Sequence, residues 1–465
     1  MRERGLGFRG GMSEDLCGHG KKARGRKDVW RGVSAFMCAF LLFAVFVVPA
    51  ASHEKLASED YTLQIYGNAN EDDTIDVRDV TYIKLVIFEK KPETDLCDAN
   101  YDGRVSMLDV VQTKLIIVGK EGELTVVDRT NRIVTIHKPV DRIVSVFPGA
   151  TRLILGLGAA DKLVGLGTWD HEYVVNDYQR VGLHAPNWEK VVGDLRELPE
   201  VGSGYTPDVE LILSLKPDIV LTYEYRPEYK ALQDAGIPVI GVPTSTESIK
   251  EGFYGLKFLG YVLDKEERAE EIIGYFDEIV SDVTEITETI PEEEKPRVYF
   301  FWGSHLTKAS IRYDTIELAG GILVSKDCAP PTFGGSVTDI EKEQIIDWNP
   351  DIILVSTNIG RLDPKVEDIL SDPDLQTVTA VKEKKVYYTL GAYYLVGIDP
   401  PRLITELIIQ AKLFHPDKFE NLDLEKEANE LFERFYGVDG LWTEFIELYK
   451  EKYGFDPWSN LGSVK

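Results

Sequence analysis

The chain has 465 residues, of which 43% are hydrophobic, 10% aromatic and 28% charged, with 4 cysteines. This composition predicts about two or three globular domains with cores of their own, and it excludes wholesale disorder, a collagen-like chain and a disulfide scaffold. The formal charge is −27, from 79 acidic and 52 basic residues. A surface this acidic repels phosphate backbones, so we expect no nucleic-acid partner. Adaptation to a saline habitat would give the same bias without any acidic site.

The N-terminal segment, residues 1–52, has the pattern of an export signal. A basic stretch around Lys21–Lys27 precedes the uncharged apolar run Val33–Val48 and the small residues Ala50–Ser52. Positive charge holds such an end in the cytoplasm, so we expect the remainder to be exported, to an extracellular or cell-surface location. The alternative is an uncleaved membrane anchor, since 16 apolar residues just span a thin bilayer. Because the basic leader is long, a further alternative is that translation starts at Met12 or at a later residue.

Residues 61–120 contain a short internal repeat. The stretch from Asn68 to Asp79 recurs thirty residues later, from Asp98 to Asp109. In both copies oxygen-bearing side chains occupy loop positions 1, 3, 5, 9 and 12, and position 7 offers its backbone carbonyl. Such a ring of hard oxygens suits Ca²⁺, which takes about six to eight oxygen ligands. The candidate ligands are Asn68, Asn70, Asp72, Thr74, Asp76 and Asp79 in the first loop, and Asp98, Asn100, Asp102, Arg104, Ser106 and Asp109 in the second.

Each loop runs into an apolar stretch with helical periodicity, and no helix precedes it. With Asp at position 12, this arrangement resembles the type I dockerin module, which implies two bound Ca²⁺ ions and a cohesin-bearing partner. Asp73 replaces the family's glycine at position 6, where a positive φ is expected. Positions 10 and 11, which usually contact the cohesin, are Val77, Arg78, Met107 and Leu108. The alternative is an acidic pair of turns that holds no metal.

From Leu124 onward, short apolar runs alternate with helical stretches, which predicts α/β units with mostly parallel sheets. Residues 124–139 have the pattern of a hairpin, and residues 148–151 read as a strand-to-helix turn. The expected strands are residues 142–147, 218–223, 238–242, 297–302, 351–356 and 385–390.

A second internal similarity divides this part of the chain into halves. Residues 209–221 and 343–355 each read as a short amphipathic helix, a Pro-Asp turn and a buried strand. Between them, Lys265–Thr289 carries apolar residues along one helical face, a rod of roughly 37 Å. We therefore expect an α/β fold of two similar lobes joined by a long rigid helix, preceded by a small all-α calcium-binding module. Because one stiff connection cannot hinge widely, the lobes should close by small rotations.

The order of these motifs resembles the helical-backbone substrate-binding proteins of ABC importers, which take iron-siderophore, haem and cobalamin cargo. The resemblance covers about 330 residues, through RIVSVFPGATRLILGLGAADKLVG, VELILSLKPDIVL, the long helix, EQIIDWNPDIILV and AVKEKKVYYTLG. The expected parts are a leader at 1–52, a dockerin at 61–120, a first lobe at 124–263, a connecting helix at 264–290 and a second lobe at 296–455.

In this family a glutamate on each lobe pairs with arginines of the permease, which implies that role for Glu210 and Glu343. The alternative is that both are ordinary solvated charges. The cargo would lie between the lobes, at strand ends, where aromatic faces suit a macrocycle or catecholate, Arg an anionic group, and His or Tyr an Fe or Co ion. An aromatic residue at a strand end can equally be core packing. The candidates are Thr151, Trp169, Asp170, Tyr223, Tyr225, Trp302, His305, Arg312, Tyr393 and Tyr394.

The sequence carries no pattern of an enzyme. Residues 156–167 hold two glycines in phase with a dinucleotide loop but lack the third, and no P-loop, nucleophile elbow, HExxH or zinc-spaced Cys/His set occurs. We expect an exported solute-binding protein that delivers an iron complex (siderophore or haem) or a corrinoid to an ABC permease, and that a calcium-dependent dockerin tethers to a cohesin partner. One alternative is a structural or adhesion component of a cohesin–dockerin complex. A dockerin-borne hydrolase is disfavoured, since no paired carboxylates stand out. Whether Cys97 and Cys328 are bonded stays open.

Overall fold

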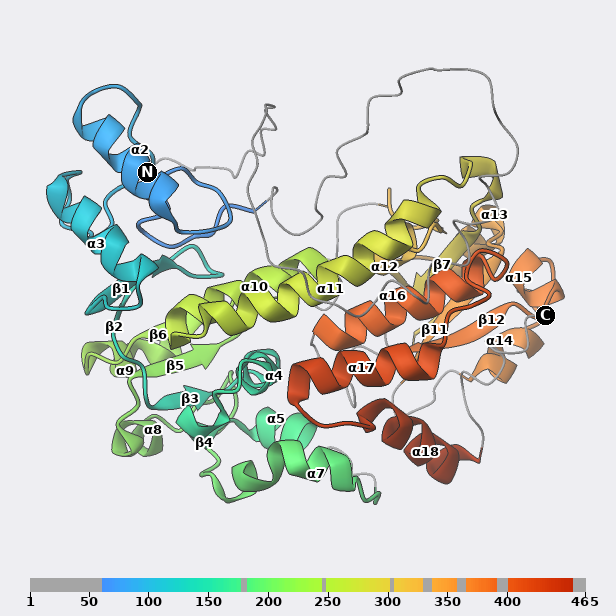
Figure 1. Cartoon of the computed structure of the whole chain (residues 1–465). Coiled ribbons are helices and arrows are strands. Elements are labelled where there is room, and N and C mark those ends of the chain that lie inside the picture. The colour runs from blue at the N-terminus through green and yellow to red at the C-terminus, as the bar shows by residue number, and fades with distance from the viewer. Residues whose placement is uncertain are drawn as a thin grey trace. The chain divides into compact units, whose positions relative to one another are not determined.

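The computed structural model describes residues 61–176, 182–244, 248–301, 305–328, 337–357, 365–390 and 400–454 (Figure 1). These segments belong to one compact unit, Ser52–Lys465. The leader and the apolar run expected within residues 1–52 lie outside the described residues. Within the described segments, no helix has both the length and the apolar character that a membrane span requires.

Residues 61–120, called here the loop module, fold as two helices that each follow an acidic loop. The residue at loop position 9 caps each helix, and the aspartate at position 12 accepts a hydrogen bond from the amide of the capping residue. The apolar faces of the helices meet in a small core that contains Val80, Ile83 and Val110. The helices are α2 (Val77–Ile87) and α3 (Met107–Ile117).

An antiparallel hairpin of β1 (Glu123–Val127) and β2 (Ile133–His137) follows the loop module. Its first strand also pairs with the loop module, because the amide of Tyr66 donates to the carbonyl of Thr125 at 2.9 Å. The hairpin is therefore hydrogen-bonded to the segment that precedes it, as well as leading into the first sheet.

The first large sheet has four parallel strands in the order β4-β3-β5-β6. Its strands are short and almost wholly buried, as expected where helices cover both faces of a parallel sheet. The strands are β3 (Ile143–Ser145), β4 (Leu163–Leu166), β5 (Ile219–Thr222) and β6 (Val239–Gly241). The accompanying helices are α4 (Pro148–Gly156), α5 (Thr168–Asp170), α7 (Pro186–Val192), α8 (Val209–Leu215), α9 (Lys230–Asp234) and α10 (Ile249–Leu263).

The second large sheet is separate from the first and has the order β10-β8-β7-β11-β12, with β9 paired to β7. Strands β9, β7, β11 and β12 pair in parallel, whereas β8 and β10 are antiparallel additions at one edge. The strands are β7 (Arg297–Phe301), β8 (Lys308–Ser310), β9 (Ile322–Leu323), β10 (Val337–Asp339), β11 (Ile352–Thr357) and β12 (Val386–Leu390). The helices are α12 (Asp314–Leu318), α13 (Lys342–Trp348), α14 (Val366–Ser371), α15 (Thr379–Lys382) and α16 (Pro400–Phe414).

The long helix expected between the two halves is α11 (Glu266–Thr287). It has 22 residues, a length of roughly 33 Å, and its apolar stripe is buried from Ala269 to Val283. It packs against α10 and α16, and Figure 1 shows these helices side by side.

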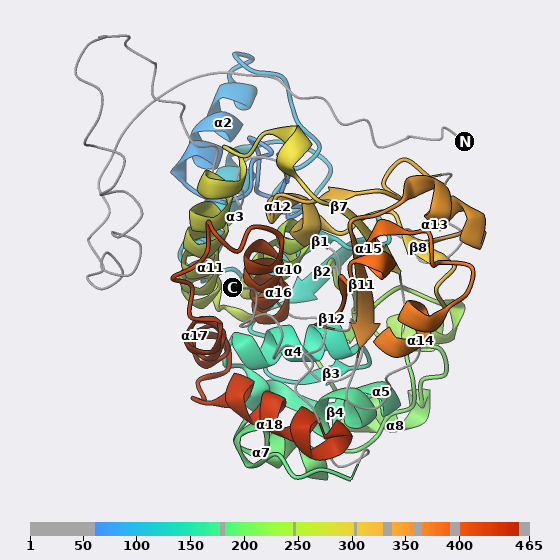
Figure 2. The same cartoon turned by 90° about the vertical axis from the view of Figure 1, so that its right-hand side faces the viewer.

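The two halves are connected by more than this helix, so the expectation of one stiff connection is incomplete. Two C-terminal helices, α17 (Leu424–Tyr436) and α18 (Leu441–Tyr453), contact elements of the first half. The carboxylate of Glu444 on α18 accepts hydrogen bonds from the amides of Asn187 at 2.8 Å and Trp188 at 3.0 Å, at the start of α7. Figure 2 shows α18 beside α7. These contacts further restrict relative motion of the halves.

Candidate functional site

An exposed pair of aromatic rings lies at the carboxyl edge of the first sheet. Trp169 follows β4 and is 37% exposed, and Tyr205, in the loop before α8, is 47% exposed. Their ring centroids are 5.2 Å apart in an edge-on contact. The guanidinium carbon of Arg226, which follows β5, lies 3.9 Å from the centroid of the Tyr205 ring. Open α/β sheets bind ligands at this edge.

Tyr223 is a further exposed ring at the same edge, 40% exposed and in edge-on contact with Phe147 at 5.2 Å. Arg129, from the turn of the β1–β2 hairpin, places its guanidinium carbon 4.1 Å from the centroid of the Tyr223 ring and donates to its hydroxyl at 2.6 Å. Arg129 also donates to the carbonyl of Thr244 at 2.5 Å. The hairpin thus adds a cation to this edge, from a segment outside the first sheet.

Thr151 and Asp170 are both fully buried. The Thr151 hydroxyl forms hydrogen bonds with Ser145 Oγ at 2.8 Å and with the carboxyl of Asp170. Burial raises the pKa of Asp170 well above its ordinary value. A Cβ on Gly167 would meet Asp170 Oδ2 at 2.8 Å, so the buried carboxyl lies directly against the turn that carries Trp169. Both residues therefore support this turn from within.

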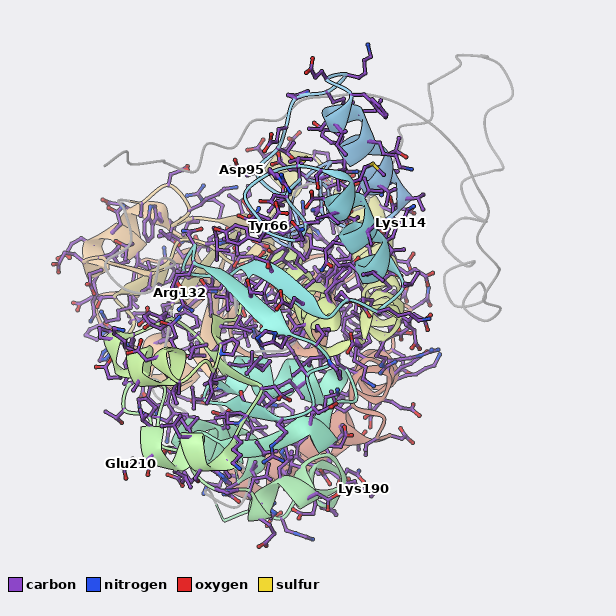
Figure 3. All side chains as sticks on the ribbon, turned by 90° about the vertical axis from the view of Figure 1, so that its left-hand side faces the viewer. Tyr66, Asp95, Lys114, Arg132, Lys190 and Glu210 are labelled. Atoms are coloured by element: carbon purple, nitrogen blue, oxygen red, sulfur yellow. The ribbon has the colours of Figure 1, made fainter. Side chains whose placement is uncertain are left out.

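Tyr225 contacts helix α9 and the turn of the hairpin. Its hydroxyl donates to Gln233 Oε1 on α9 at 2.7 Å, and the guanidinium carbon of Arg132 lies 3.8 Å from its ring centroid. The ring is half-buried between α9 and the hairpin turn, and Figure 3 labels Arg132 on that hairpin.

Two of the five candidates from the second half are described by the structure. His305 is exposed. Arg312 forms an ion pair with Glu251 of α10, in which Nη2 lies 2.6 Å from Oε1. Its Nε also lies 3.9 Å from Asp314 Oδ1. Its side chain is 43% exposed, so it is an already paired cation near the junction of the halves. The other three, Trp302, Tyr393 and Tyr394, lie outside the described residues.

Glu210 and Glu343 are both exposed and occupy the first turns of α8 and α13. Each helix ends in a left-handed residue, Lys216 (φ 50°) or Asn349 (φ 44°), before the Pro-Asp turn. The two glutamates therefore have the same local setting in the two halves. Figure 3 labels Glu210 at the outer surface of α8.

The first loop (Asn68–Asp79) contains an orphaned buried oxygen. Asn68 is fully buried, and its Oδ1 has no hydrogen-bond partner among the described residues. The carboxylate of Asp79 accepts from the amides of Asn70 at 3.0 Å and Asp76 at 2.8 Å, while burial raises its pKa to about 6. A buried oxygen without a donor and a desolvated carboxylate in the same loop fit a cation. Asn68, Asn70 and Asp79, with the Thr74 carbonyl, would hold it. Asp72 and Asp76 pair with Arg78 at 3.1 and 2.8 Å in this structure and would complete the set only if they turned away from it.

The second loop (Asp98–Asp109) repeats the turn pattern but is more open. The carboxylate of Asp98 accepts from the amides of Asp102 at 3.1 Å and Gly103 at 2.8 Å. Asp109 accepts from the amides of Asn100 and Ser106 at 3.1 and 2.7 Å. The described residues contain no cluster of three or more His, Cys, Asp or Glu side chains arranged around a metal, so any ion here relies on amide, hydroxyl and carbonyl oxygens as well.

The φ expectation at Asp73 is wrong. Positive φ occurs at loop position 4 in both copies, at Glu71 (58°) and Tyr101 (54°), and at position 6 only in the second, at Gly103 (93°). Asp73 has an ordinary φ and pairs with Lys257 instead. The cysteine question is also answered, since Cys97 and Cys328 are free thiols.

A groove of about 690 Å³ lies along α11 and α17, away from the strand ends. It contains none of the residues that the sequence nominates. Its lining is polar and charged: Arg268, Lys426, Asn429, Glu430, Glu433, Arg434, Gly437 and Asp439.

Sequence reasoning missed Phe147, Tyr205, Arg129 and Arg226 at the edge of the first sheet. Phe147 ends an expected strand, so the same strand-end criterion could have found it. Tyr205 lies far from any strand end, and Arg129 is 94 residues from the hydroxyl that it contacts. Only tertiary contacts bring these two to the site.

A family model described as "Periplasmic binding protein" matches residues 143–393. The chain is 24% identical over 335 residues to the molybdate-binding protein MolA of Haemophilus influenzae, covering 67% of this chain and 90% of MolA. It is 27% identical over 304 residues to an uncharacterized ABC transporter substrate-binding lipoprotein of Bacillus subtilis, covering 64% and 87%. It is also 22% identical over 303 residues to a cobalamin-binding protein of Halobacterium salinarum, covering 63% and 74%.

Solved structures show the same fold. A periplasmic solute-binding protein from Veillonella parvula superposes with a TM-score of 0.54 at 23% identity, covering 70% of this chain and 98% of that one. CeuE of Helicobacter pylori with Ni(II) bound superposes with a TM-score of 0.52 at 21% identity, covering 69% and 99%. The relatives are solute-binding proteins rather than enzymes. Because the matched residues span more than half of the chain and include both large sheets, the chain belongs to the periplasmic binding protein family of ABC-transporter substrate-binding proteins.

Proposed function

We propose that the chain is the exported solute-binding protein of an ABC importer, and that its cargo is an iron complex (siderophore or haem) or a corrinoid. The observation that carries this proposal is the surface at the carboxyl edge of the first sheet. There Trp169, Tyr205 and Tyr223 are exposed, and Arg226 and Arg129 lie against two of the rings. Flat rings pack on macrocycles and catecholates, and guanidinium groups pair with their carboxylates or phenolates.

The names of the relatives support the cargo class without selecting one member. They include a cobalamin-binding protein and an Fe(3+)-citrate-binding protein, but also a molybdate-binding protein. Molybdate is a small oxoanion with no flat face, so it would use the guanidinium groups far more than the rings. A ligand panel must therefore include it as the rival.

The test is tryptophan fluorescence of the purified full chain with haem, cobalamin, a ferric catecholate, ferric citrate and molybdate. We expect one metal complex to quench the emission with saturation. Trp169→Ala and Tyr205→Ala should each weaken its binding by about two- to tenfold, since an aromatic contact contributes about 0.5–1.5 kcal/mol in addition to the burial of its surface area. Tyr101→Ala, at an exposed ring on the loop module, is the matched control and should leave binding unchanged. If molybdate alone gives saturable quenching, the cargo is an oxoanion and the proposed cargo class is wrong. If no ligand of the panel changes the fluorescence, the structural or adhesion role is favoured.

We further propose that Glu210 and Glu343 contact the permease. Both are exposed and have the same local setting in the two halves. A pair of separated surface carboxylates suits a partner that carries two basic patches, where such charges set orientation and association rate more than affinity.

The loop module is proposed to be a calcium-binding dockerin that tethers the protein to a cohesin-bearing partner. Three apolar residues at the starts of its helices are unusually exposed: Val77 is 69% exposed, and Met107 and Leu108 are each 54% exposed. Exposed apolar side chains grouped on one small module are typical of an interaction surface. A groove of about 340 Å³ adjoins Val77 on α2, between Arg78 and Lys91.

Calorimetric titration of the full chain with CaCl₂ tests the metal and should reveal two sites. Binding of a cohesin-bearing protein, measured with and without chelator, tests the tether. Val77→Asp combined with Leu108→Asp should abolish that binding while leaving calcium uptake intact. Cohesin binding that survives both changes would contradict the assigned surface.

A further inference from the structure

One face of helix α10 contacts the loop module. Tyr254, Lys257 and Tyr261 are spaced by three and four residues, so they share that face. Tyr254 accepts a hydrogen bond from the amide of Gln64, before the first loop, at 3.1 Å. The other two side chains reach into the first loop itself.

Tyr261 contacts the peptide unit that carries the candidate ligand at position 7. Its hydroxyl accepts from the amide of Ile75 at 3.0 Å and lies 3.5 Å from Thr74 Oγ1. The amide of Ile75 and the carbonyl of Thr74 belong to one planar trans peptide, in which N–H and C=O point in opposite directions. By holding the amide, Tyr261 therefore directs the Thr74 carbonyl away from α10.

Lys257 fastens the neighbouring residue. Its Nζ lies 2.7 Å from Asp73 Oδ2, and the two side chains are only 16% and 18% exposed. An ion pair shielded from water is screened less than one at the surface. This contact also gives a reason for aspartate at position 6, where the second loop has Gly103.

The second loop has no comparable surroundings. Gly103 and Arg104, which match Asp73 and Thr74, are exposed, whereas the first-loop residues are half-buried. A Cβ placed on Gly103 would meet no atom within 4 Å. The repeat is thus nearly symmetric in sequence but asymmetric in its contacts.

We propose that Tyr261 is a positioning residue for the first loop, so that this loop binds a divalent cation as part of its interface with α10, while the second loop binds by itself. The inference rests on the calcium assignment proposed above. By linkage, a cation in the first loop strengthens the attachment of the loop module to α10 by the same factor that the attachment strengthens its binding. A cation in the first loop then stabilises the contact between the loop module and α10.

The test separates the two loops in the full chain. Asp102→Ala disables the second loop, and Asp72→Ala disables the first. In the Asp102→Ala background, Tyr261→Phe should weaken Ca²⁺ binding by about fivefold, the effect of one lost hydrogen bond. In the Asp72→Ala background the same change should have no effect. Tyr254→Phe, which removes the neighbouring hydroxyl on the same face, is the matched control: it weakens the attachment but does not free the Ile75 amide, so it should weaken Ca²⁺ binding clearly less than Tyr261→Phe in the first background and have no effect in the second.

Hydrogen exchange supplies a second measurement, since chelation should deprotect the Ile75 amide more in the Tyr261→Phe variant than in wild type. Equal weakening of both loops by Tyr261→Phe, or no weakening of the first, would overturn the inference. An equal effect of Tyr254→Phe would show that attachment alone matters and would overturn the positioning role. If neither background binds Ca²⁺, both this inference and the calcium assignment are wrong. Cargo binding, measured by tryptophan fluorescence, is tested independently of that result.

Discussion

Asp218 and Asp351 have the same role in the two large sheets. Oδ2 of Asp218 accepts a hydrogen bond from the amide of Arg142, and Oδ2 of Asp351 accepts one from the amide of Arg297, each at 2.8 Å. In both halves the aspartate precedes one strand of the sheet and its arginine partner begins or precedes the neighbouring parallel strand. In each of the two sheets, the Pro-Asp motif thus fixes the alignment of two neighbouring parallel strands.

Replacing either aspartate should destabilise its own half. Asp218→Ala or Asp351→Ala leaves a strand-edge amide without its charged acceptor, which costs about 1–2 kcal/mol. Urea unfolding followed by circular dichroism measures the loss. Asp347→Ala, on the exposed side of α13, is the control and should change stability little; equal losses from all three would contradict the assigned role.

Reversal of the charges at Glu210 and Glu343 should separate transport from binding. The double variant Glu210→Lys, Glu343→Lys should lose uptake in cells or proteoliposomes that contain the permease, because lysines repel the permease's basic patches. The dissociation constant for cargo should stay the same. Glu292→Lys with Glu293→Lys, an equally exposed pair, should transport normally. Loss of cargo binding in the first double variant would mean that the glutamates are misassigned.

The contact between α4 and α17 should tolerate no added methyl group. A Cβ on Gly156 would lie 2.2 Å from Cζ of Phe435, so Gly156→Ala forces repacking and should cost about 1–3 kcal/mol. Gly274→Ala, on the open side of α11 where a Cβ meets nothing within 4 Å, should instead stabilise by about 0.5–1 kcal/mol. Thermal unfolding of both variants checks the opposite signs; a stable Gly156→Ala protein would disprove the close packing.

Glu266 should make stability depend on pH. Burial raises its pKa from an ordinary 4.5 to about 7, with the nearby carboxylates Asp264 and Glu121 adding to the rise and Lys138 opposing it. The folded state therefore holds the proton more tightly than the unfolded state. The stability that this group contributes is complete below pH 4.5 and is lost as the pH rises to about 7.

The variant Glu266→Gln should remove this loss. Its free energy of unfolding, relative to wild type, should be more favourable at pH 8 than at pH 5, as measured by urea titration at both values. Glu270→Gln, on an exposed face of the same helix, should show no such difference. A relative stability of Glu266→Gln that is the same at both pH values would contradict the prediction.

All six strands expected from apolar runs are present, because a strand buried on both faces must be apolar along its whole length. Strands β8 and β10 were not predicted because each contains a single apolar residue, and β9 was not predicted because it has only two residues. Their place at the sheet is decided by pairing with β7 and with one another. Strand β4 was overlooked because its apolar run is interrupted by Gly165.

For the candidate sites, local spacing was enough to nominate oxygen ligands in the two loops and one glutamate in each half, because each set follows from a repeated motif in the sequence; their roles stay predictions. Exposure was not predictable. Thr151 and Asp170 are buried, whereas Tyr205 reaches the surface beside Trp169.

The sequence by itself determined the family, the α/β pattern and the repeated loop, since these depend on periodicity and on short-range spacing. Tertiary structure alone decided which rings face solvent, that Arg129 joins Tyr223 across 94 residues, and that Tyr261 contacts the first loop across 186. The physical reason is that burial and hydrogen bonding are settled by segments distant in the chain, whose meeting no local pattern records.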